Sequence, residues 1–492
     1  MLSRSLTAIL AVLVLAACTP AARPGAAPAP SAARPATVAP GDRPNIVFVL
    51  TDDLAWNLVR YMPQVRALQR AGTTFTNYTV TDSLCCPSRA SIFSGKFPHN
   101  TGVFTNNAPD GGYRAFSARG AESSTFATDL RTAGYRTAMM GKYLNGYLPQ
   151  HRVVPPGWTE WDVAGNAYGE YSYRLLENRR LRHYGNRPAD YLTDVLSAKA
   201  QRFITASADA RQPFLLEVAT FAPHAPYTPA RRDENRFLTV PAPRTGGYDR
   251  LPSAAPPWLA RRWPLTTRQQ AEIDVEFRLR AQAVQAIDRM LGALRTTLAR
   301  AGVARNTVVA FSSDNGFHMG EHRLNPGKQT AFDTDVRVPL MLAGPGIRAG
   351  ATATQPAENI DLRPTFGDLA GVGTPADVDG RSLRPLLAGA ALPGWRAAAL
   401  IEHHGPDTRP GDPDYPAAFS GNPPTYSAMR TTRYTYVEYA GGFLEYYDRA
   451  NDPDQVHNIA ARLAPAAKER LHRQLTALTA CHGAASCWTA AR

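Results

Sequence analysis

Cysteine is scarce in this chain, which has five in 492 residues. Cys481 and Cys487 are close in sequence and could close a small disulfide loop, as in proteins of an oxidising compartment. That pairing leaves Cys18, Cys85 and Cys86 each without a partner. The alternative is a vicinal disulfide between Cys85 and Cys86, which is strained and rare.

The chain also lacks internal repeats, a nucleic-acid-binding motif and an apolar run long enough to span a bilayer. What it has in excess is positive charge, with a formal net charge of +13. Such a surplus suits an anionic substrate or an acidic surface, although a compositional bias toward Arg, Ala and Pro would also produce it. At this length, we expect one large domain and one smaller one.

The first residues are typical of an export signal, because Arg4 precedes a short apolar run. The run ends in Leu-Ala-Ala before Cys18, which resembles a bacterial lipobox. We therefore predict a signal peptide at 1–17, lipidation of Cys18, and a disordered Ala- and Pro-rich linker at 18–43. The protein would then be exported and anchored by lipid on the outer face of the cell membrane, or else secreted. The rival interpretation is an ordinary signal peptide cut near Ala17, which leaves Cys18 as a free thiol.

Buried strands alternate with amphipathic helices along most of the chain. Apolar and β-branched runs predict strands at 45–50, 75–80, 135–140, 214–221, 306–311 and 338–343. Helical periodicity with caps or glycine stops predicts helices at 62–71, 124–133, 191–208, 267–301 and 361–370, the last capped by Asp361. This alternation predicts an α/β sandwich with a mostly parallel sheet.

The character of the sequence changes near residue 395. Segments at 398–402, 427–432, 434–439 and 443–447 read as short strands in hairpins, and a helix is expected at 464–478. We therefore predict a catalytic domain at 44–394 and a small α+β subdomain with an antiparallel sheet at 395–492. Two irregular stretches, at 145–187 and 229–265, are expected to form loops and hairpins that shape a substrate cleft.

The two adjacent cysteines precede a predicted helix. Pro87 favours the first helical position, and the small apolar residues after Arg89 continue the helix. Cys85 would then lie just before a helix N-terminus, where a thiol pKa is lowered and anions are attracted. A pair of buried thiols beside a capped helix is the alternative.

Several predicted strands end in polar residues that can carry chemistry. Asp52-Asp53, Lys142, His224 and Asp314-Asn315 each follow a buried strand. Ligands of open α/β sheets bind at the carboxyl ends of the strands, so one cleft could collect all of these residues. Each motif alone is often a turn or a helix cap, and their joint occurrence is what favours a site.

The residue types in this set suit a site that binds a divalent cation and a tetrahedral anion. The acidic and amide members supply hard oxygen ligands, which suit Ca²⁺ or Mg²⁺ rather than a metal that prefers thiolates. These predicted ligands are Asp52, Asp53, Asp314 and Asn315. Basic members would donate hydrogen bonds to a tetrahedral anion. These predicted donors are Arg89, Lys142, His224 and Lys328.

The run Cys85-Cys86-Pro87-Ser88-Arg89, followed by small apolar residues up to Gly95, resembles the sulfatase signature C-x-P-S-R. Residues 443–448 and 451–453 are similar to the Leu-Tyr-Asp and Asp-Pro run of that family's C-terminal subdomain, and the resemblance covers roughly 44–459. It implies an alkaline-phosphatase-like fold in which a formylglycine-generating enzyme oxidises Cys85 to formylglycine.

The same resemblance implies a role for each residue of the set. A divalent cation, usually Ca²⁺ and alternatively Mg²⁺, would be bound by the four oxygen ligands and residue 85. Arg89 and Lys142 would stabilise the formylglycine hydrate and the sulfate. His224 would contact the sulfate or its leaving oxygen, and Lys328 would bind the sulfate. In the implied reaction, a hydrate oxygen attacks sulfur, the alcohol leaves, and the second hydroxyl re-forms the aldehyde as sulfate departs.

One position departs from the family pattern. Many members carry Gly-Lys-x-His, and here the fourth residue is Leu144, followed by Asn145. This stretch and the double cysteine resemble the glucosamine-6-sulfatase branch. The missing histidine leaves the base for the hydrate open. His318 and His322 are candidates for that role or for lining a substrate-binding cleft, and an ordinary surface-loop role is the alternative for each.

We expect this chain to hydrolyse sulfate esters, with a sulfated sugar, glycan or aryl sulfate as its partner and no nucleic acid. A phosphonate or phosphodiester hydrolase on the same scaffold is one alternative, because a site for a tetrahedral anion serves both. The other alternative is a catalytically silent lipoprotein that binds sulfated glycans, which an unmodified Cys85 thiol would favour.

Overall fold

The computed structural model describes residues 43–492 except 411 and 413. The predicted signal peptide, the lipidated Cys18 and all but the last residue of the linker lie outside the described residues. Within the described part of the chain, no helix is both long and apolar enough to cross a bilayer.

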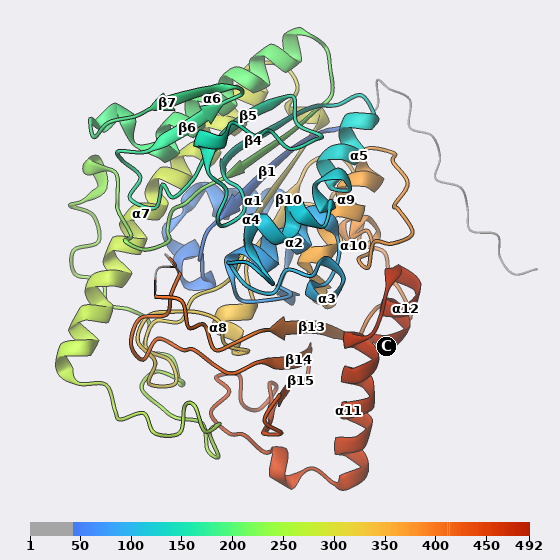
Figure 1. The fold of residues 1–492 in the computed structure, drawn as a ribbon. Helices are drawn as coiled ribbons and strands as arrows, with labels where there is room; N and C mark the ends of the chain where they lie inside the picture. The colour runs from blue at the N-terminus through green and yellow to red at the C-terminus, as the bar shows by residue number, and fades with distance from the viewer. Residues whose placement is uncertain (1–42, 411, 413) are drawn as a thin grey trace, which may run out of the picture. The chain divides into compact units, whose positions relative to one another are not determined.

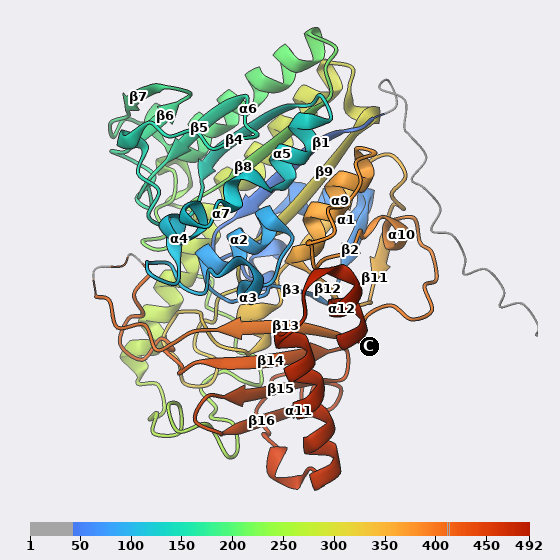
Figure 2. The ribbon, with the colours of Figure 1, turned by 45° about the vertical axis from the view of Figure 1, so that its right-hand side comes forward.

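A ten-stranded sheet lies at the centre of the fold (Figure 1, Figure 2). In order across the sheet, its strands are β11 (Ala351–Ala353), β2 (Thr73–Phe75), β10 (Leu340–Ala343), β9 (Thr307–Ser313), β1 (Asn45–Thr51), β8 (Phe214–Ala219), β4 (Arg136–Lys142), β5 (Glu160–Ala164), β6 (Arg174–Glu177) and β7 (Arg180–His183). The five strands from β9 to β5 run parallel, while β10 and the β6–β7 hairpin are antiparallel to their neighbours. This arrangement confirms the predicted α/β class with a mostly parallel sheet.

The central strand β1 shows why these segments form buried strands. All of its seven residues are buried. Ile46, Phe48 and Leu50 point into one hydrophobic cluster, and Val47 and Val49 point into another on the opposite face. A strand covered on both faces needs apolar side chains at every position, which is the continuous run seen in the sequence.

Helices cover both faces of the sheet (Figure 2). One face packs against α1 (Pro63–Ala71), α6 (Leu192–Asp209) and α7 (Thr267–Arg300), and the other against α2 (Cys85–Ser94), α5 (Phe126–Thr132) and α9 (Leu362–Leu369). The remaining short α-helices and strands before residue 395 are α3 (Pro98–Thr101), α4 (Gly112–Ala118), α8 (Asp333–Val336), α10 (Arg384–Leu387) and the paired strands β3 (Tyr78–Thr79) and β12 (Ala357–Glu358).

The C-terminal segment forms a second, antiparallel sheet of β13 (Ala398–His403), β14 (Tyr426–Thr431), β15 (Tyr434–Tyr439) and β16 (Leu444–Asp448). It carries α11 (Pro465–Thr479) and α12 (Gly483–Ala490), and a disulfide joins Cys481 to Cys487. The sheet contacts the rest of the chain directly, because the backbone N–H of Glu402 on β13 donates to the carbonyl of Thr81. A domain boundary at residue 395 stays a prediction.

Three local predictions need correction. Helix α2 begins at Cys85 and not after it, so Pro87 is its third residue. Asp361 does not cap α9 through its side chain; its carboxylate accepts backbone N–H groups of Arg381 and Glu358 instead. The stretch 145–187 contains a hairpin, β6–β7, as predicted, but β5, β6 and β7 also extend the main sheet, which the prediction did not include.

Candidate active site

The polar strand ends meet at one edge of the sheet. Asp52 and Asp53 directly follow β1, and Lys142 is the last residue of β4. His224 lies just beyond β8, and Asp314-Asn315 directly follows β9. These four strands are parallel neighbours, so their carboxyl ends share an edge, and the N-terminus of α2 brings Cys85 to the same place.

Cys85 is a buried free thiol at the centre of this group. Its Sγ lies 3.2 Å from Asp52 Oδ1, and Lys328 Nζ donates to it at 2.9 Å. Burial first, and then the carboxylates of Asp414 and Asp52, raise the pKa of Cys85 well above its usual value. The predicted lowering by the helix N-terminus is therefore wrong for this unmodified thiol, because desolvation and two negative neighbours outweigh the helix dipole.

Cys86 is not equivalent to Cys85. It is also free, so the vicinal disulfide is excluded. Its side chain belongs to the hydrophobic core, and burial raises the pKa of Cys86 to about 12. The backbone N–H of Cys86 donates to Asn106 Oδ1 at 2.9 Å.

The acidic residues form a group that can hold a cation. One ligand atom from each of Asp52, Asp53, Cys85 and His224 lies within 4.8 Å of the others, and all four residues are buried. This group contains His224, which the predicted ligand set lacked. Asp314 and Asn315 adjoin it: Asn315 Nδ2 donates to Asp53 Oδ1 at 2.6 Å, and the Asp53 backbone N–H donates to Asp314 Oδ1 at 3.2 Å.

Two observations indicate that this group can bind a divalent cation. Asn315 Oδ1 is buried and has no hydrogen-bond partner among the described residues. Three buried carboxylates also lie close together, an arrangement that needs positive charge between them. Oxygen-rich sites of this kind suit Ca²⁺ or Mg²⁺.

Three basic side chains neutralise part of this charge. Lys142 Nζ donates to Asp52 Oδ2 at 2.5 Å, and Lys328 Nζ donates to Asp53 Oδ1 at 2.8 Å. Burial lowers the pKa of each lysine, but the surrounding carboxylates raise it by more than burial lowers it. The pKa of each lysine is therefore well above its usual value. Arg89 Nε donates to Asp314 Oδ2 at 2.7 Å, so this guanidinium fixes the orientation of a candidate metal ligand.

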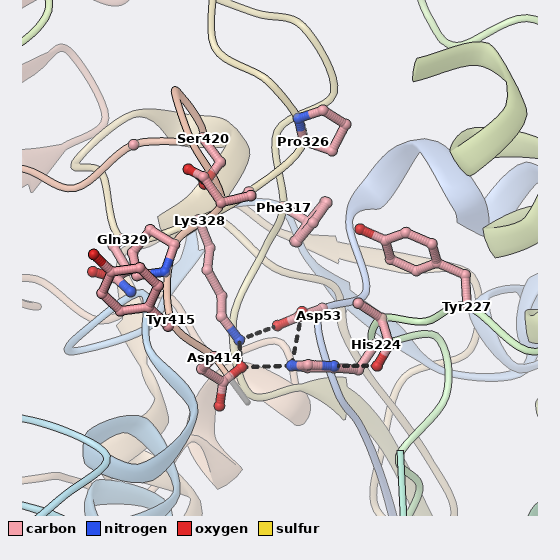
Figure 3. Close-up of a pocket in the computed structure, with 15 residues that line it drawn as sticks. Asp53, His224, Tyr227, Phe317, Pro326, Lys328, Gln329, Asp414, Tyr415 and Ser420 are labelled. Carbon is pink, nitrogen blue, oxygen red and sulfur yellow. Dashed lines mark hydrogen bonds and ion pairs between the residues drawn. The ribbon is translucent and has the colours of Figure 1, made fainter. Parts of the chain in front are cut away.

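His224 is held as a proton donor. Its Nδ1 faces the carbonyl oxygen of Ala225 at 2.8 Å and must donate to it, which aims Nε2 into the site. There Nε2 lies 2.5 Å from Asp414 Oδ1 and 3.7 Å from Asp53 Oδ2 (Figure 3). Burial lowers the pKa of His224, while Asp53, Asp414 and Asp52 raise it, and the net shift is upward. The ring is therefore favoured as an imidazolium.

Asp414 is the residue that sequence reasoning missed. It lies on the long connection between β13 and β14, and its side chain is 1 % exposed. Lys328 Nζ donates to Oδ1 at 2.8 Å, while the amides of Asn106 and Asn145 each donate to Oδ2 at 2.7 Å. Burial raises the pKa of Asp414, but Lys328 and His224 bring it well below its usual value. No motif or strand end marks this residue in the sequence.

The two predicted histidines lie elsewhere. His318 is buried, with Nδ1 bonded to Asp335 Oδ1 at 2.9 Å and Nε2 facing the carbonyl of Ser420 at 2.9 Å. His322 stacks on Phe332 with ring centroids 3.7 Å apart and lines a different cavity. Neither ring hydrogen-bonds to Cys85 or to the carboxylates and lysines around it, and a role for either histidine in the site stays a prediction.

A cavity of about 120 Å³ opens beside Asp53, His224, Lys328 and Asp414. Figure 3 shows the acidic and basic side chains converging on its floor. Aromatic residues line its walls, and they are Tyr227, Phe317 and Tyr415. If the basic groups bind the anionic part of a substrate, its organic part would therefore lie against these aromatic rings.

Comparisons with known proteins agree with this geometry. The family model described as "Sulfatase" matches residues 44–372, and the model described as "N-sulphoglucosamine sulphohydrolase, C-terminal" matches residues 320–480. The chain is 35% identical over 473 residues to the N-acetylglucosamine-6-sulfatase of Homo sapiens, covering 90% of this chain and 85% of that protein. It is 34% identical over 374 residues to the extracellular sulfatase SULF-1 homolog of Drosophila melanogaster, covering 74% of this chain and 33% of that protein.

Among solved structures, the chain is similar to one in complex with its substrate D-glucosamine-2-N,6-O-disulfate. The TM-score is 0.74 at 24% sequence identity, and the match covers 88% of this chain and 97% of the other. At that identity, the likeness supports the fold.

Proposed function

The chain belongs to the sulfatase family and is a sulfuric ester hydrolase, and from that premise we propose that it removes the 6-O-sulfate of N-acetylglucosamine, alone or at the end of a glycan. One observation carries the assignment of the site: Cys85 lies among buried carboxylates and lysines at the carboxyl ends of the parallel strands. A buried thiol so placed is poorly explained by packing alone.

The residues around Cys85 divide the chemistry among them. Formylglycine made from Cys85 would supply the nucleophilic oxygen, and a cation held by Asp52, Asp53, Asp314 and Asn315 with residue 85 would act as a Lewis acid. Lys142 and Lys328 bring buried ammonium groups to the place where sulfate charge must be bound. Arg89 fixes Asp314 and, through Nη1, the carbonyl of Lys142 at 2.9 Å, which stiffens the floor of the site.

His224 is the proposed proton donor to the leaving oxygen. Its orientation is set by the Ala225 carbonyl, and its Nε2 faces the cavity floor. A sugar alcohol is a poor leaving group, so protonation by a positioned acid is worth roughly 10²–10⁴-fold in rate.

The substrate class rests on the relatives and on the cavity walls. The human relative is named for N-acetylglucosamine 6-sulfate, and a fold neighbour was solved with a 6-O-sulfated glucosamine. Aromatic walls formed by Tyr227, Phe317 and Tyr415 suit the apolar face of a sugar ring. Export is supported by the Drosophila relative, which is named extracellular, and by the Cys481–Cys487 disulfide. Lipid anchoring at Cys18 remains part of the proposal.

Kinetics on a substrate panel test this function. We expect kcat/KM for N-acetylglucosamine 6-sulfate to exceed that for N-acetylgalactosamine 6-sulfate and for a phosphonate monoester. Cys85→Ala should abolish turnover, whereas Cys86→Ala, a matched change at the neighbouring core thiol, should retain it. Faster cleavage of the phosphonate ester, or full activity of Cys85→Ala, would contradict the assignment.

A further inference from the structure

All three large aromatic side chains that are exposed in the described part of the chain lie near the catalytic cavity. Tyr415 is 40 % exposed and lines the cavity itself. Phe419 is 58 % exposed, and the next residue, Ser420, lines the same cavity. Trp263 is 86 % exposed and follows Arg262, whose guanidinium lies 4.5 Å from the centre of the Phe419 ring. Together, Arg262, Trp263 and Phe419 form an aromatic rim beside the cavity. Apolar rings left in water at such a place indicate a surface that a ligand covers.

The aromatic rim is fixed to the segment that carries Lys328. The backbone N–H of Asn325 donates to the carbonyl of Phe419 at 3.0 Å, and Asn325 Nδ2 donates to the carbonyl of Ala418 at 2.8 Å. Lys328, the proposed sulfate ligand, comes three residues after Asn325, so their Cα atoms lie at most about 11 Å apart. In Figure 3, Ser420 lies at the end of the cavity away from its charged floor. A sugar chain that leaves the sulfate site in this direction meets the aromatic rim.

The backbone of Phe419 also points to a role for its ring at the surface. Its φ is 69°, in the left-handed region that bulky residues rarely adopt. Glycine adopts this conformation without strain. The ring recovers little of the cost by burial, because most of the residue is exposed. A phenylalanine at this position therefore serves the fold poorly and suits contact with a ligand.

Arg262 brings a positive charge without a counter-ion to the aromatic rim. Burial lowers the pKa of Arg262, and no neighbouring carboxylate raises it. Its Nε is buried without a hydrogen-bond partner among the described residues. Its backbone is held in place, because Arg323 Nη1 donates to the Arg262 carbonyl at 3.1 Å. A guanidinium in this state suits a carboxylate or sulfate group on the ligand.

We propose that the aromatic rim binds the sugar unit that follows the terminal 6-sulfated N-acetylglucosamine, and that this unit is acidic. The inference rests on the proposed function, because the sulfate site fixes where the glycan begins. Phe419 and Trp263 stack on the apolar faces of the sugar rings, and Arg262 pairs with the acidic group. The preferred substrate is then the end of an anionic oligosaccharide rather than the free monosaccharide.

Three substrates with the same terminal 6-sulfated N-acetylglucosamine test the proposal. They are the monosaccharide, a trisaccharide that continues with a uronate, and a trisaccharide that continues with a neutral hexose. Wild-type enzyme should have its lowest KM for the uronate trisaccharide. Phe419→Ala and Trp263→Ala should each raise KM for both trisaccharides roughly 2–10-fold. Their kcat values, and their KM for the monosaccharide, should not change, because these rings touch no reacting atom.

The charge is tested separately from the rings. Arg262→Gln should remove the preference for the uronate over the neutral trisaccharide, together with the rise in KM that salt causes for the uronate substrate. Phe419→Tyr keeps an aromatic ring and should retain the wild-type KM. Leu238→Ala is the matched control, because Leu238 is an exposed apolar residue that does not line the catalytic cavity. It should change KM for none of the three substrates.

Two results would overturn the inference. Wild-type enzyme with the same KM for all three substrates would leave the aromatic rim without a ligand. An equal rise in KM of Phe419→Ala for the monosaccharide and the trisaccharides would mean a structural role. A uronate preference that survives in Arg262→Gln would refute the acidic unit.

Calorimetric titration of Cys85→Ala protein with the uronate trisaccharide separates this inference from the proposed function, because binding is then measured without turnover. Weaker binding when Phe419→Ala is added, with no turnover of any substrate by wild-type enzyme, would refute the proposed function alone. Unchanged binding in that double variant, with normal turnover by wild-type enzyme, would refute the inference alone.

Discussion

Glu217 places an unpaired carboxyl group inside the central sheet. It lies on β8 between β1 and β4 and is fully buried. Neither of its carboxyl oxygens has a hydrogen-bond partner among the described residues. Burial raises the pKa of Glu217 from 4.5 to about 8, against a smaller lowering by Arg89. We predict that Glu217→Gln stabilises the protein at alkaline pH.

The sign follows from proton binding. An acid whose pKa is raised on folding holds its proton more tightly in the folded chain than in the unfolded one. Between pH 4.5 and about 8, the folded chain therefore binds one proton more, and stability falls as pH rises. The difference between the two pKa values corresponds to about 5 kcal/mol of unfolding free energy, fully lost above the folded pKa.

Urea unfolding of both proteins near pH 5 and pH 9 measures this effect. The gain in unfolding free energy from Glu217→Gln should be small near pH 5 and larger by about 3–5 kcal/mol near pH 9. Glu272→Gln, at an exposed glutamate of α7, is the control, and its effect on the unfolding free energy should be the same at both pH values. An equal difference between wild type and Glu217→Gln at both pH values would refute the reasoning.

Three further predictions concern the site and its support. His224→Gln should lower kcat roughly 10²–10⁴-fold for a sugar sulfate and far less for an aryl sulfate with a good leaving group, because His224 protonates the leaving oxygen; equal losses would count against it. Asn315→Ala should weaken cation binding, so that its activity needs more Ca²⁺ after chelation than wild type does, and an unchanged Ca²⁺ dependence would contradict this. Cys487→Ser opens the disulfide at the end of α11 and should lower the unfolding free energy by about 2 kcal/mol, measured by urea unfolding; unchanged stability would show that the bond is dispensable.

The strand ends could be predicted from the sequence because two general rules act together. A continuous apolar run marks a strand buried on both faces, and parallel strands bring their carboxyl ends to one edge. Asp52, Lys142, His224 and Asp314 follow such runs, and the structure brings them together. The start of α2 was misplaced by two residues, since Pro87 occupies a later position in the first turn.

Asp414 could not be predicted in this way. The connection from β13 to β14 has no periodicity, and only the folded chain shows that it returns over the edge of the main sheet. The pKa of Cys85 was also beyond sequence reasoning, because its direction depends on burial and on Asp414 and Asp52. Likewise β5, β6 and β7 pair with strands that are close in sequence, but their own residues lack the continuous apolar run that marks β1.

The central claim is that Cys85 becomes an aldehyde nucleophile, and one measurement tests it most directly. Protein purified from its native host is digested with trypsin, and the peptide 71–89 is fragmented by mass spectrometry to locate any change at Cys85 or Cys86. The account predicts that the –CH₂SH group of Cys85 is replaced by –CHO, or by its hydrate, while Cys86 keeps its thiol. An intact Cys85 thiol in active enzyme would contradict it.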